Sequence, residues 1–290
     1  LEVLARGAED YLVKSRFEVD AFRRSLRYAV ERARMRAELA VTNARLQREL
    51  EVGGSIQTSI LPRALAVPGL DIAARMEPAT EVGGDYYDVL PFEGGVWLGI
   101  GDVAGHGMQA AIVALMAQAS ISSLTTRQPN ATPATIVATL NDVLYDNIRQ
   151  RLQHDEHMTL TLLRYEDVGR VTFAGAHEEI LVKRQDGCEA IMTPGTWLGA
   201  RRDIRGVTED AELTLGAGDV MVLYSDGITE AMNPAGEQLG LERLRDRVAA
   251  HSGDSAQSLL DDIWALVHAW TGGAAEHDDD LTMLIVRRQP

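Results

Sequence analysis

The chain has 290 residues, of which 46% are hydrophobic and 24% are charged, so its composition excludes a wholly disordered protein. Its 28 Lys and Arg residues stand against 43 Asp and Glu residues, and the net charge of −15 argues against binding to nucleic acid or an anionic membrane. The single cysteine, Cys188, excludes a disulfide framework and a cysteine-based zinc site. No apolar run has the length of a membrane span, so we expect a cytoplasmic protein. The sequence begins at Leu1 and not at a methionine, so we expect a fragment of a longer protein.

Residues 1–16, LEVLARGAEDYLVKSR, are too short to form a core of their own. They resemble the last strand of a two-component receiver domain, with matches at Gly7, Ala8, Asp10, Tyr11, Leu12 and Lys14. In receivers that lysine contacts the phosphoryl group, whereas the proline that usually follows it is Ser15 here. The aspartate that would be phosphorylated is missing from this segment. We therefore interpret residues 1–16 as the remnant of a truncated receiver in a response regulator, with a frayed leader peptide as the alternative.

Residues 17–51 contain neither Gly nor Pro and are rich in good helix formers, which predicts one long helix that Gly53-Gly54 then breaks. Small and apolar residues recur every three or four positions, at Val19, Phe22, Leu26, Val30, Ala33, Ala37, Ala40 and Ala44. This spacing is typical of a coiled coil, so we expect residues 17–52 to be a linker helix. We expect it to form a parallel homodimer through residues 17–51; the alternative is a single helix lying on its own domain.

The remaining residues, 53–290, have the length of one domain and contain no internal repeat. Apolar runs predict strands at Leu70–Met76, Val96–Gly101, Met158–Leu163, Val171–Ala174, Ile180–Lys183, Val220–Tyr224 and Leu281–Val286. Helical patterns occupy Met108–Leu124, Pro133–Leu152, Leu241–Ala250 and Ser255–Trp270, with Thr132 as a predicted N-cap. Strands and helices come in clusters without strict alternation, which favours an α+β fold of antiparallel sheets covered by helices.

Aspartates stand where the predicted strands begin or end. Asp102 ends one strand, Asp226 follows another, and Asp278–Asp280 open the last. A carboxylate at the mouth of a buried strand costs several kcal/mol without a positive partner, and neither Asp102 nor Asp226 has a Lys or Arg within six residues. Mg²⁺ and Mn²⁺ prefer carboxylate and water ligands, so we infer a metal site. Asp85, which follows Gly83-Gly84, is a fourth candidate.

Each of these motifs alone also has a purely structural explanation. An Asp-Gly after a strand is typical of a turn, and three successive aspartates are typical of a solvated surface. Their order along the chain is more specific than any one of them. It runs Gly-Gly-Asp-x-x-Asp, Gly-Asp-Val-x-Gly-His-Gly, Ser-Asp-Gly-x-x-Glu and Asp-Asp-x-Thr.

These ordered motifs resemble those of the SpoIIE-like bacterial branch of the PPM (protein phosphatase 2C-like) serine/threonine phosphatases. Within residues 53–290 the matching segments are Ile56-Gln57, Ile60-Leu61-Pro62, Pro78-Ala79, Glu81–Asp88, Gly101–Gly107, Ser225–Glu230 and Asp279–Thr282. The resemblance implies one phosphatase domain over residues 53–290. It also implies an α/β/β/α sandwich of two antiparallel sheets flanked by helices, preceded by the long coiled-coil helix.

The resemblance further implies a centre of two Mn²⁺ or Mg²⁺ ions. The positions that match its ligands are Asp85, Asp102, Val103, Asp226 and Asp279. Asp102 would bridge both ions, the Val103 carbonyl would add a ligand, and Asp226 and Asp279 would hold the first ion. Asp85 would reach the centre directly or through water. Asp280 matches a neighbour of the ligands, and Asp278 matches no role.

The implied reaction is hydrolysis of phosphoserine or phosphothreonine by a metal-activated water, with Asp85, Asp102, Asp226 and Asp279 as the catalytic set. His106 is a candidate general acid, although we favour a role of Gly105-His106-Gly107 in starting the next helix, with a metal-bound water as the acid. By resemblance, the substrate is a phosphorylated anti-sigma-factor antagonist protein in a partner-switching pathway that controls transcription.

Two other functions compete with this one. Diguanylate cyclases share the Gly-Gly-Asp triplet, but Tyr86-Tyr87 replace their Glu-Phe, and the motifs at Asp226 and Asp279 would be unexplained. A scaffold that holds a phosphoprotein without hydrolysing it is a non-enzymatic alternative, which the intact carboxylates disfavour. One departure from the family is that its Ala-Gly-His-x-Pro stretch is replaced by residues 174–179, AGAHEE.

Overall fold

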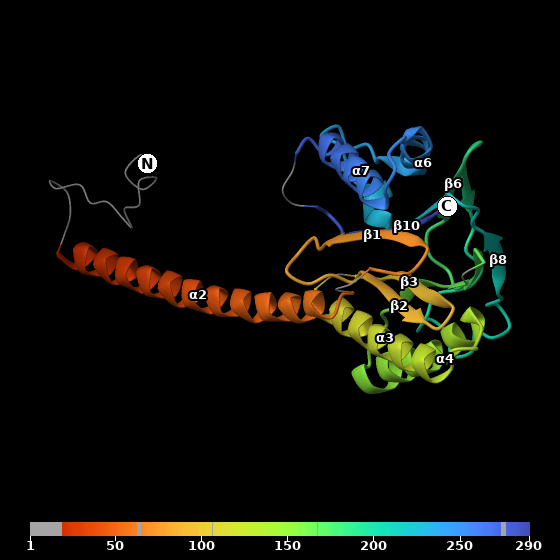
Figure 1. Ribbon diagram of the computed structural model, residues 1–290. Helices are drawn as coiled ribbons and strands as arrows, with labels where there is room; N and C mark the ends of the chain where they lie inside the picture. The colour runs from red at the N-terminus through yellow and green to blue at the C-terminus, as the bar shows by residue number, and fades with distance from the viewer. Residues whose placement is uncertain (1–18, 63–64, 106, 167, 274–276) are drawn as a thin grey trace. The chain divides into compact units, whose positions relative to one another are not determined.

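The computed structural model describes residues 19–62, 65–105, 107–166, 168–273 and 277–290 (Figure 1). Internal contacts divide the chain into two units, Leu1–Val52 and Gly53–Pro290. The predicted receiver remnant, residues 1–16, lies outside the described residues. The described part of the first unit is helical.

Helix α2 runs from Val19 to Ser59, so the prediction that Gly53-Gly54 ends the helix is wrong. The two glycines instead permit close packing inside the second unit. A Cβ on Gly54 would lie 2.0 Å from the carbonyl oxygen of Glu81, and one on Gly53 would lie 2.7 Å from the terminal methyl of Met108. Glycine inside a helix costs about 1 kcal/mol relative to alanine, and we attribute its tolerance here to this tertiary packing.

Two five-stranded antiparallel sheets form the centre of the second unit. The first sheet has the order β1 (Leu70–Glu77), β10 (Leu281–Arg288), β9 (Val220–Tyr224), β6 (Ile180–Arg184) and β7 (Gly187–Ile191). The second has the order β2 (Tyr86–Phe92), β3 (Gly95–Val103), β4 (Met158–Glu166), β5 (Arg170–Ala174) and β8 (Ala211–Thr214). The chain crosses from the second sheet to the first between β5 and β6.

Helices cover the outer face of each sheet, as Figure 1 shows. They are α3 (Met108–Arg127), α4 (Pro133–Tyr145), the π-helix η1 (Asp146–Leu152), α5 (Asp226–Glu230), α6 (Gly240–Ala250) and α7 (Ala256–Trp270). One apolar cluster lies between the sheets, a second under α3 and α4, and a third under α6 and α7. These layers confirm the expected α/β/β/α sandwich. Thr132 caps α4 as predicted, since its hydroxyl accepts a hydrogen bond from the Thr135 N–H.

Sequence patterns missed three strands, and each lies at the edge of a sheet: β2, β7 and β8. β7 and β8 have few buried positions, so their apolar patterns are weak. β2 begins with four buried residues, but Asp88 and Pro91 interrupt its apolar run. Proline has no N–H group to donate to a neighbouring strand. Pro91 is tolerated in β2 because this strand lies at the edge of its sheet and has a neighbour on one side only. The predicted helix 133–152 is α-helical only to Tyr145 and continues as the π-helix.

Helix α3 has an apolar composition. Within the described residues it is the one helix that is long and apolar enough to cross a membrane, judged by length and composition. Its buried residues include Ala110, Ala114, Ala117 and Ile121, which pack into the cluster beneath the second sheet. Small residues at these positions let the helix approach the sheet closely.

Candidate metal centre and active site

Strand ends from both sheets meet at one end of the sandwich. Asp85 directly precedes β2, and Asp102 is the penultimate residue of β3. Asp226 starts the short helix that follows β9, and Asp279 and Asp280 directly precede β10. Asp85 and Asp280 are buried, Asp102 and Asp226 are half-buried, and Asp279 is exposed.

The Asp280 carboxylate organises the loop that carries the Gly-Gly-Asp motif. Its Oδ1 accepts a hydrogen bond from the Ala79 N–H at 2.7 Å, and its Oδ2 accepts from the N–H of Gly84 at 2.6 Å and of Asp85 at 3.4 Å. A Cβ on Gly83 would lie 2.3 Å from Oδ2, so only glycine permits this approach. These backbone donors occupy both oxygens of Asp280, which agrees with a structural role beside the predicted ligands.

Ser225 links Asp85 to the opposite sheet, and sequence analysis did not single it out. Its hydroxyl donates to Asp85 Oδ2 at 2.8 Å and accepts from the Thr282 N–H at 3.0 Å. Ser225 and Asp85 are 140 positions apart in the chain. The place of Ser225 in the Ser-Asp-Gly motif was the available signal, but nothing in the motif indicates which carboxylate the serine contacts.

The Asp102 carboxylate and the Val103 carbonyl face the same small space beside Gly84. A Cβ on Gly84 would lie 2.7 Å from the Val103 oxygen and 3.1 Å from Asp102 Oδ1. The Val103 N–H also donates to the Gly84 carbonyl at 3.3 Å, which ties the two loops together. A side chain at position 84 would fill this space, so the glycine leaves two oxygen donors accessible.

The carboxylates of this end repel one another. Burial, followed by the charges of Asp226, Asp279 and Asp280, raises the pKa of Asp102 to about 7. Burial and the Asp102 charge raise the pKa of Asp85 well above its ordinary value, and burial with the charge of Glu230 raises the pKa of Asp226. A bound cation would relieve this repulsion and restore the charged forms.

The donor set fits a hard divalent cation. No three Asp, Glu, His or Cys side chains among the described residues lie close enough together to enclose an ion by themselves. The oxygens beside Gly84 come from one carboxylate, that of Asp102, and from the Val103 carbonyl, and the charges of Asp226 and Asp279 act on Asp102. Mg²⁺ and Mn²⁺ accept such ligands and keep several waters of their own, so an incomplete protein shell suits them. The predicted general-acid candidate, His106, lies outside the described residues.

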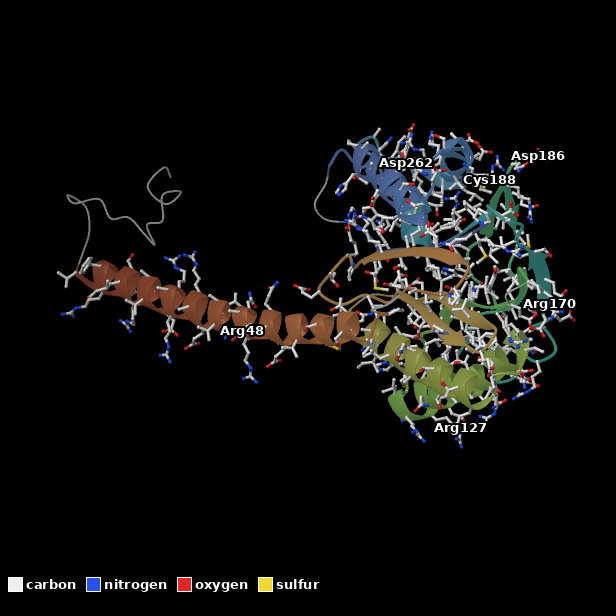
Figure 2. All side chains as sticks on the ribbon, viewed as in Figure 1. Arg48, Arg127, Arg170, Asp186, Cys188 and Asp262 are labelled. Atoms are coloured by element: carbon white, nitrogen blue, oxygen red, sulfur yellow. The ribbon has the colours of Figure 1, made fainter. Side chains whose placement is uncertain are left out.

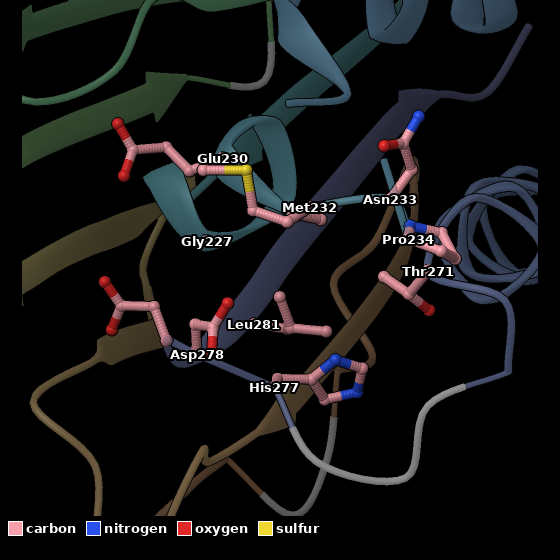
Figure 3. Close-up of a pocket in the computed structure, with 11 residues that line it drawn as sticks. Gly227, Glu230, Met232, Asn233, Pro234, Thr271, His277, Asp278 and Leu281 are labelled. Carbon is pink, nitrogen blue, oxygen red and sulfur yellow. The ribbon is translucent and has the colours of Figure 1, made fainter. Parts of the chain in front are cut away.

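A cavity of about 520 Å³ opens directly beside Asp279 (Figure 3). Its wall includes the acidic side chains of Glu230 and Asp278 and the apolar side chain of Met232. Asp278 therefore faces a cavity next to the predicted ligands, although sequence analysis assigned it no role. The cavity is large enough to take side chains of a bound polypeptide.

A sandwich of two antiparallel sheets between helices, with carboxylates gathered at one end, defines the protein as a PPM-type phosphatase by fold and site. The sequence matches the family described as "Stage II sporulation protein E (SpoIIE)" over residues 93–289, and the chain belongs to this family. It is accordingly a SpoIIE-like hydrolase of the PPM class, whose members are generally metal-dependent. This assignment excludes the diguanylate cyclase alternative.

Curated relatives and solved structures agree with this assignment. The chain is 27% identical to "Phosphoserine phosphatase RsbU" of Bacillus subtilis over 250 residues, which covers 82% of this chain and 70% of that protein. It is 24% identical to "Protein IcfG" of Synechocystis, covering 82% of this chain and 41% of that protein. Among solved structures it is similar to the "SiaA-PP2C domain of Pseudomonas aeruginosa", with a TM-score of 0.73, 22% identity and coverage of 86% of this chain and 99% of that one.

The fold is also that of the PP2C phosphatase domain of SpoIIE from Bacillus subtilis. The TM-score is 0.61 at 18% identity, and the match covers 75% of this chain and 63% of that one. At this identity the likeness supports the fold alone. The family match confirms the expected enzyme class, whereas the individual ligand assignments remain predictions.

Proposed function

We propose that the protein is a phosphatase that uses two Mn²⁺ or Mg²⁺ ions to remove phosphate from a serine or threonine of a regulatory protein. The observation that carries this proposal is the gathering of Asp85, Asp102 and Asp226 at the meeting point of the two sheets, where burial and neighbouring carboxylates raise the pKa of each. The relative RsbU is a phosphoserine phosphatase by name, which supports the substrate class. An anti-sigma-factor antagonist in the cytoplasm is the substrate that we propose.

The proposed ligands are Asp85, Asp102, the Val103 carbonyl, Asp226 and Asp279. When bound, the two ions would supply a water of lowered pKa and neutralise charge on the phosphoryl group. The proposed ligands lie at the ends of strands from both sheets. Ser225 donates a hydrogen bond to Asp85, and the Gly84 N–H donates one to Asp280, which holds the loop before Asp85. The cavity beside Asp279 provides room for residues that flank the phosphorylated side chain.

Release of phosphate from phosphorylated antagonist proteins tests this proposal. We expect hydrolysis that depends on about millimolar Mn²⁺ or Mg²⁺, because such sites keep several waters and few protein ligands. Asp102→Ala and Asp226→Ala should each lower the rate by about a thousandfold, since a metal centre supplies several kcal/mol of transition-state stabilisation. Both variants should remain folded, because each removes a repelled carboxylate.

Asp186→Ala is the matched control. Asp186 is an exposed aspartate between β6 and β7, labelled in Figure 2, and its removal should leave the rate unchanged. Full turnover by Asp102→Ala, or hydrolysis that survives thorough chelation, would contradict the metal centre. Binding of the phosphoprotein without any hydrolysis would favour the scaffold alternative.

The proposed function includes a division of the chain into three parts. We infer a receiver remnant at residues 1–16, a coiled-coil linker at 17–52 and the phosphatase at 53–290, as the output part of a response regulator. Leu26 and Val30, on the apolar stripe of α2, are 53% and 61% exposed, which supports a second copy of the helix as their partner in a homodimer through residues 17–51.

A pair of hydrogen bonds links the end of α2 to the loop that carries Asp85. The buried Gln57 side chain donates to the Gly83 carbonyl at 2.8 Å and accepts from the Gly83 N–H at 3.1 Å. Gly83 is two residues before Asp85. A displacement of the end of α2 would therefore act on the loop that carries a proposed ligand.

A further inference from the structure

His177 lies where the chain crosses between the two sheets. It stands between β5 of the second sheet and β6 of the first. Its backbone is held at this point by Thr193, whose hydroxyl accepts from the His177 N–H at 3.0 Å and donates to the His177 carbonyl at 2.7 Å. The position of the imidazole is thus fixed by hydrogen bonds outside the ring.

Both ring nitrogens of His177 have partners, and the partners determine the tautomer. Nε2 lies 3.0 Å from the carbonyl oxygen of Tyr224, which can only accept, so Nε2 carries a proton. Nδ1 lies 2.8 Å from the hydroxyl of Thr159. Burial lowers the pKa of His177 to about 4, so the ring is neutral and Nδ1 accepts the hydroxyl proton.

Thr159 continues the chain of hydrogen bonds to Asp102. With its own proton donated to His177, the Thr159 hydroxyl accepts from the Asp102 N–H at 3.3 Å. Thr159 faces Asp102 directly across the β3–β4 pair. The hydrogen bonds therefore run from Asp102 N–H to Thr159, from Thr159 to His177 Nδ1, and from His177 Nε2–H to the Tyr224 carbonyl.

The two ends of this series of hydrogen bonds belong to different sheets. Asp102 is on β3 of the second sheet, and Tyr224 ends β9 of the first sheet two residues before Asp226. Since both ring nitrogens are occupied, the imidazole is not available to exchange a proton with a substrate. Its contacts are suited to holding two strand ends at a fixed separation.

We propose that His177 is a positioning residue that ties the strand end carrying Asp102 to the strand end carrying Asp226 through its imidazole ring. This inference rests on the proposed function, because it assigns His177 to the support of the same metal centre. Groups that orient metal ligands typically change metal affinity or activity by about 10–100-fold when they are removed. His177 acts through the backbone that presents the carboxylates, without touching an ion or the substrate.

Two substitutions of His177 each break one of its two ring contacts and so interrupt the series of hydrogen bonds. His177→Asn places an acceptor near the position of Nδ1 and loses the contact with Tyr224, whereas His177→Gln retains a donor toward Tyr224 and loses the contact with Thr159. We expect each to raise the dissociation constant for Mn²⁺, measured by calorimetry on the full chain, by about tenfold. Thr159→Ser keeps the hydroxyl and should retain a Mn²⁺ affinity within about twofold of the wild type. Thr159→Val removes the hydroxyl and should weaken Mn²⁺ binding.

The double variant His177→Gln with Thr159→Val separates this role from general destabilisation. Both changes break the same link, so the double variant should bind Mn²⁺ no more weakly than His177→Gln alone. Additive losses, or unchanged Mn²⁺ affinity in both His177 variants, would overturn the positioning role. A fall in melting temperature of the metal-free variants with unchanged Mn²⁺ affinity would count equally against it.

Nitrogen-15 NMR of the metal-free wild-type chain provides a readout that needs neither metal nor turnover. We expect a neutral His177 ring at pH 7 with its proton on Nε2; an imidazolium or a proton on Nδ1 would refute the hydrogen-bond assignment. Failure of the wild type to bind Mn²⁺ would refute the proposed function, whereas Mn²⁺ binding that is indifferent to His177 would refute this inference alone.

Discussion

At the scale of single residues, adjacent carboxylates at the strand ends have different partners. Asp280 is buried, and three backbone N–H groups donate hydrogen bonds to its two carboxylate oxygens. Burial, followed by the charges of neighbouring carboxylates, raises the pKa of Asp102 and of Asp85. This contrast separates a carboxylate that organises a loop from the carboxylates that we propose as metal ligands.

Asp88 provides a prediction about pH. Burial raises its pKa to about 6, and the hydrogen bonds from Val89 and Gln118 offset this only in part. The folded protein therefore disfavours the charged form, and Asp88 costs stability increasingly as the pH rises through about 6. Asp88→Asn should stabilise the protein at pH 8 by about 1–2 kcal/mol, because each unit of pKa shift corresponds to about 1.4 kcal/mol.

The gain from Asp88→Asn should shrink as the pH falls from about 6 and vanish near pH 3, below the ordinary pKa of 3.8, where the carboxyl is protonated in both the folded and unfolded states. The amide introduced at position 88 can retain the Val89 contact, and a rotation of the Gln118 amide can restore the other. Urea unfolding at several pH values measures the difference. A gain independent of pH would show that packing, not charge, is responsible, and Asp186→Asn is the exposed control.

At the scale of elements, the last turns of α2 depend on two glycines with different neighbours. Gly54→Ala should be damaging, because its Cβ would lie 2.0 Å from the backbone oxygen of Glu81, which cannot rotate away. We expect lower thermal stability and a loss of activity of about tenfold or more, since Glu81 belongs to the loop that leads to Asp85. Melting temperature and phosphate release measure the two effects.

Gly53→Ala is the matched control in the same helix. Its Cβ would lie 2.7 Å from the terminal methyl of Met108, which can move, and 3.5 Å from Val82 Cγ1, which is an ordinary contact. Alanine is also favoured over glycine in a helix by about 1 kcal/mol. We expect wild-type activity and an unchanged or slightly higher melting temperature. Equal damage from both substitutions would contradict the close approach of Gly54 to the loop.

At the scale of the whole molecule, the homodimer predicted for residues 17–51 can be tested on the apolar stripe of α2. Leu26→Glu combined with Val30→Glu should make the protein monomeric, because charges in a coiled-coil seam repel. We expect the specific activity to change, although the double substitution alters none of the proposed metal ligands. Analytical ultracentrifugation and phosphate release give the two readouts.

Tyr28→Glu with Met35→Glu is the control for the dimer. Both residues are exposed but lie outside the stripe, so the double substitution should leave the association state unchanged. If the stripe variant dissociates while its phosphatase rate stays constant, the helix is only a tether. If neither variant changes the association state, the helix has no partner of its own kind.

Local patterns in the sequence determined much of the architecture. Buried strands such as β9 and β10 are continuous apolar runs, and the cap at Thr132 is a local chemical signal, so both were predictable within a few residues. The order of the acidic motifs identified the enzyme family. These features depend on residues that are close together in the chain, which is why a single sequence reports them.

Tertiary structure decided the contacts between distant segments. The helix α2 passes through Gly53 and Gly54 because the loop at Glu81 packs against it, a partner that helix propensity cannot include. The pairing of Ser225 with Asp85, and of His177 with both Thr159 and Tyr224, likewise joins residues far apart in the chain. The sequence by itself determined which residues are chemically competent; packing of the two sheets determined which of them meet, because hydrogen bonds and charge repulsion act only over short distances in space.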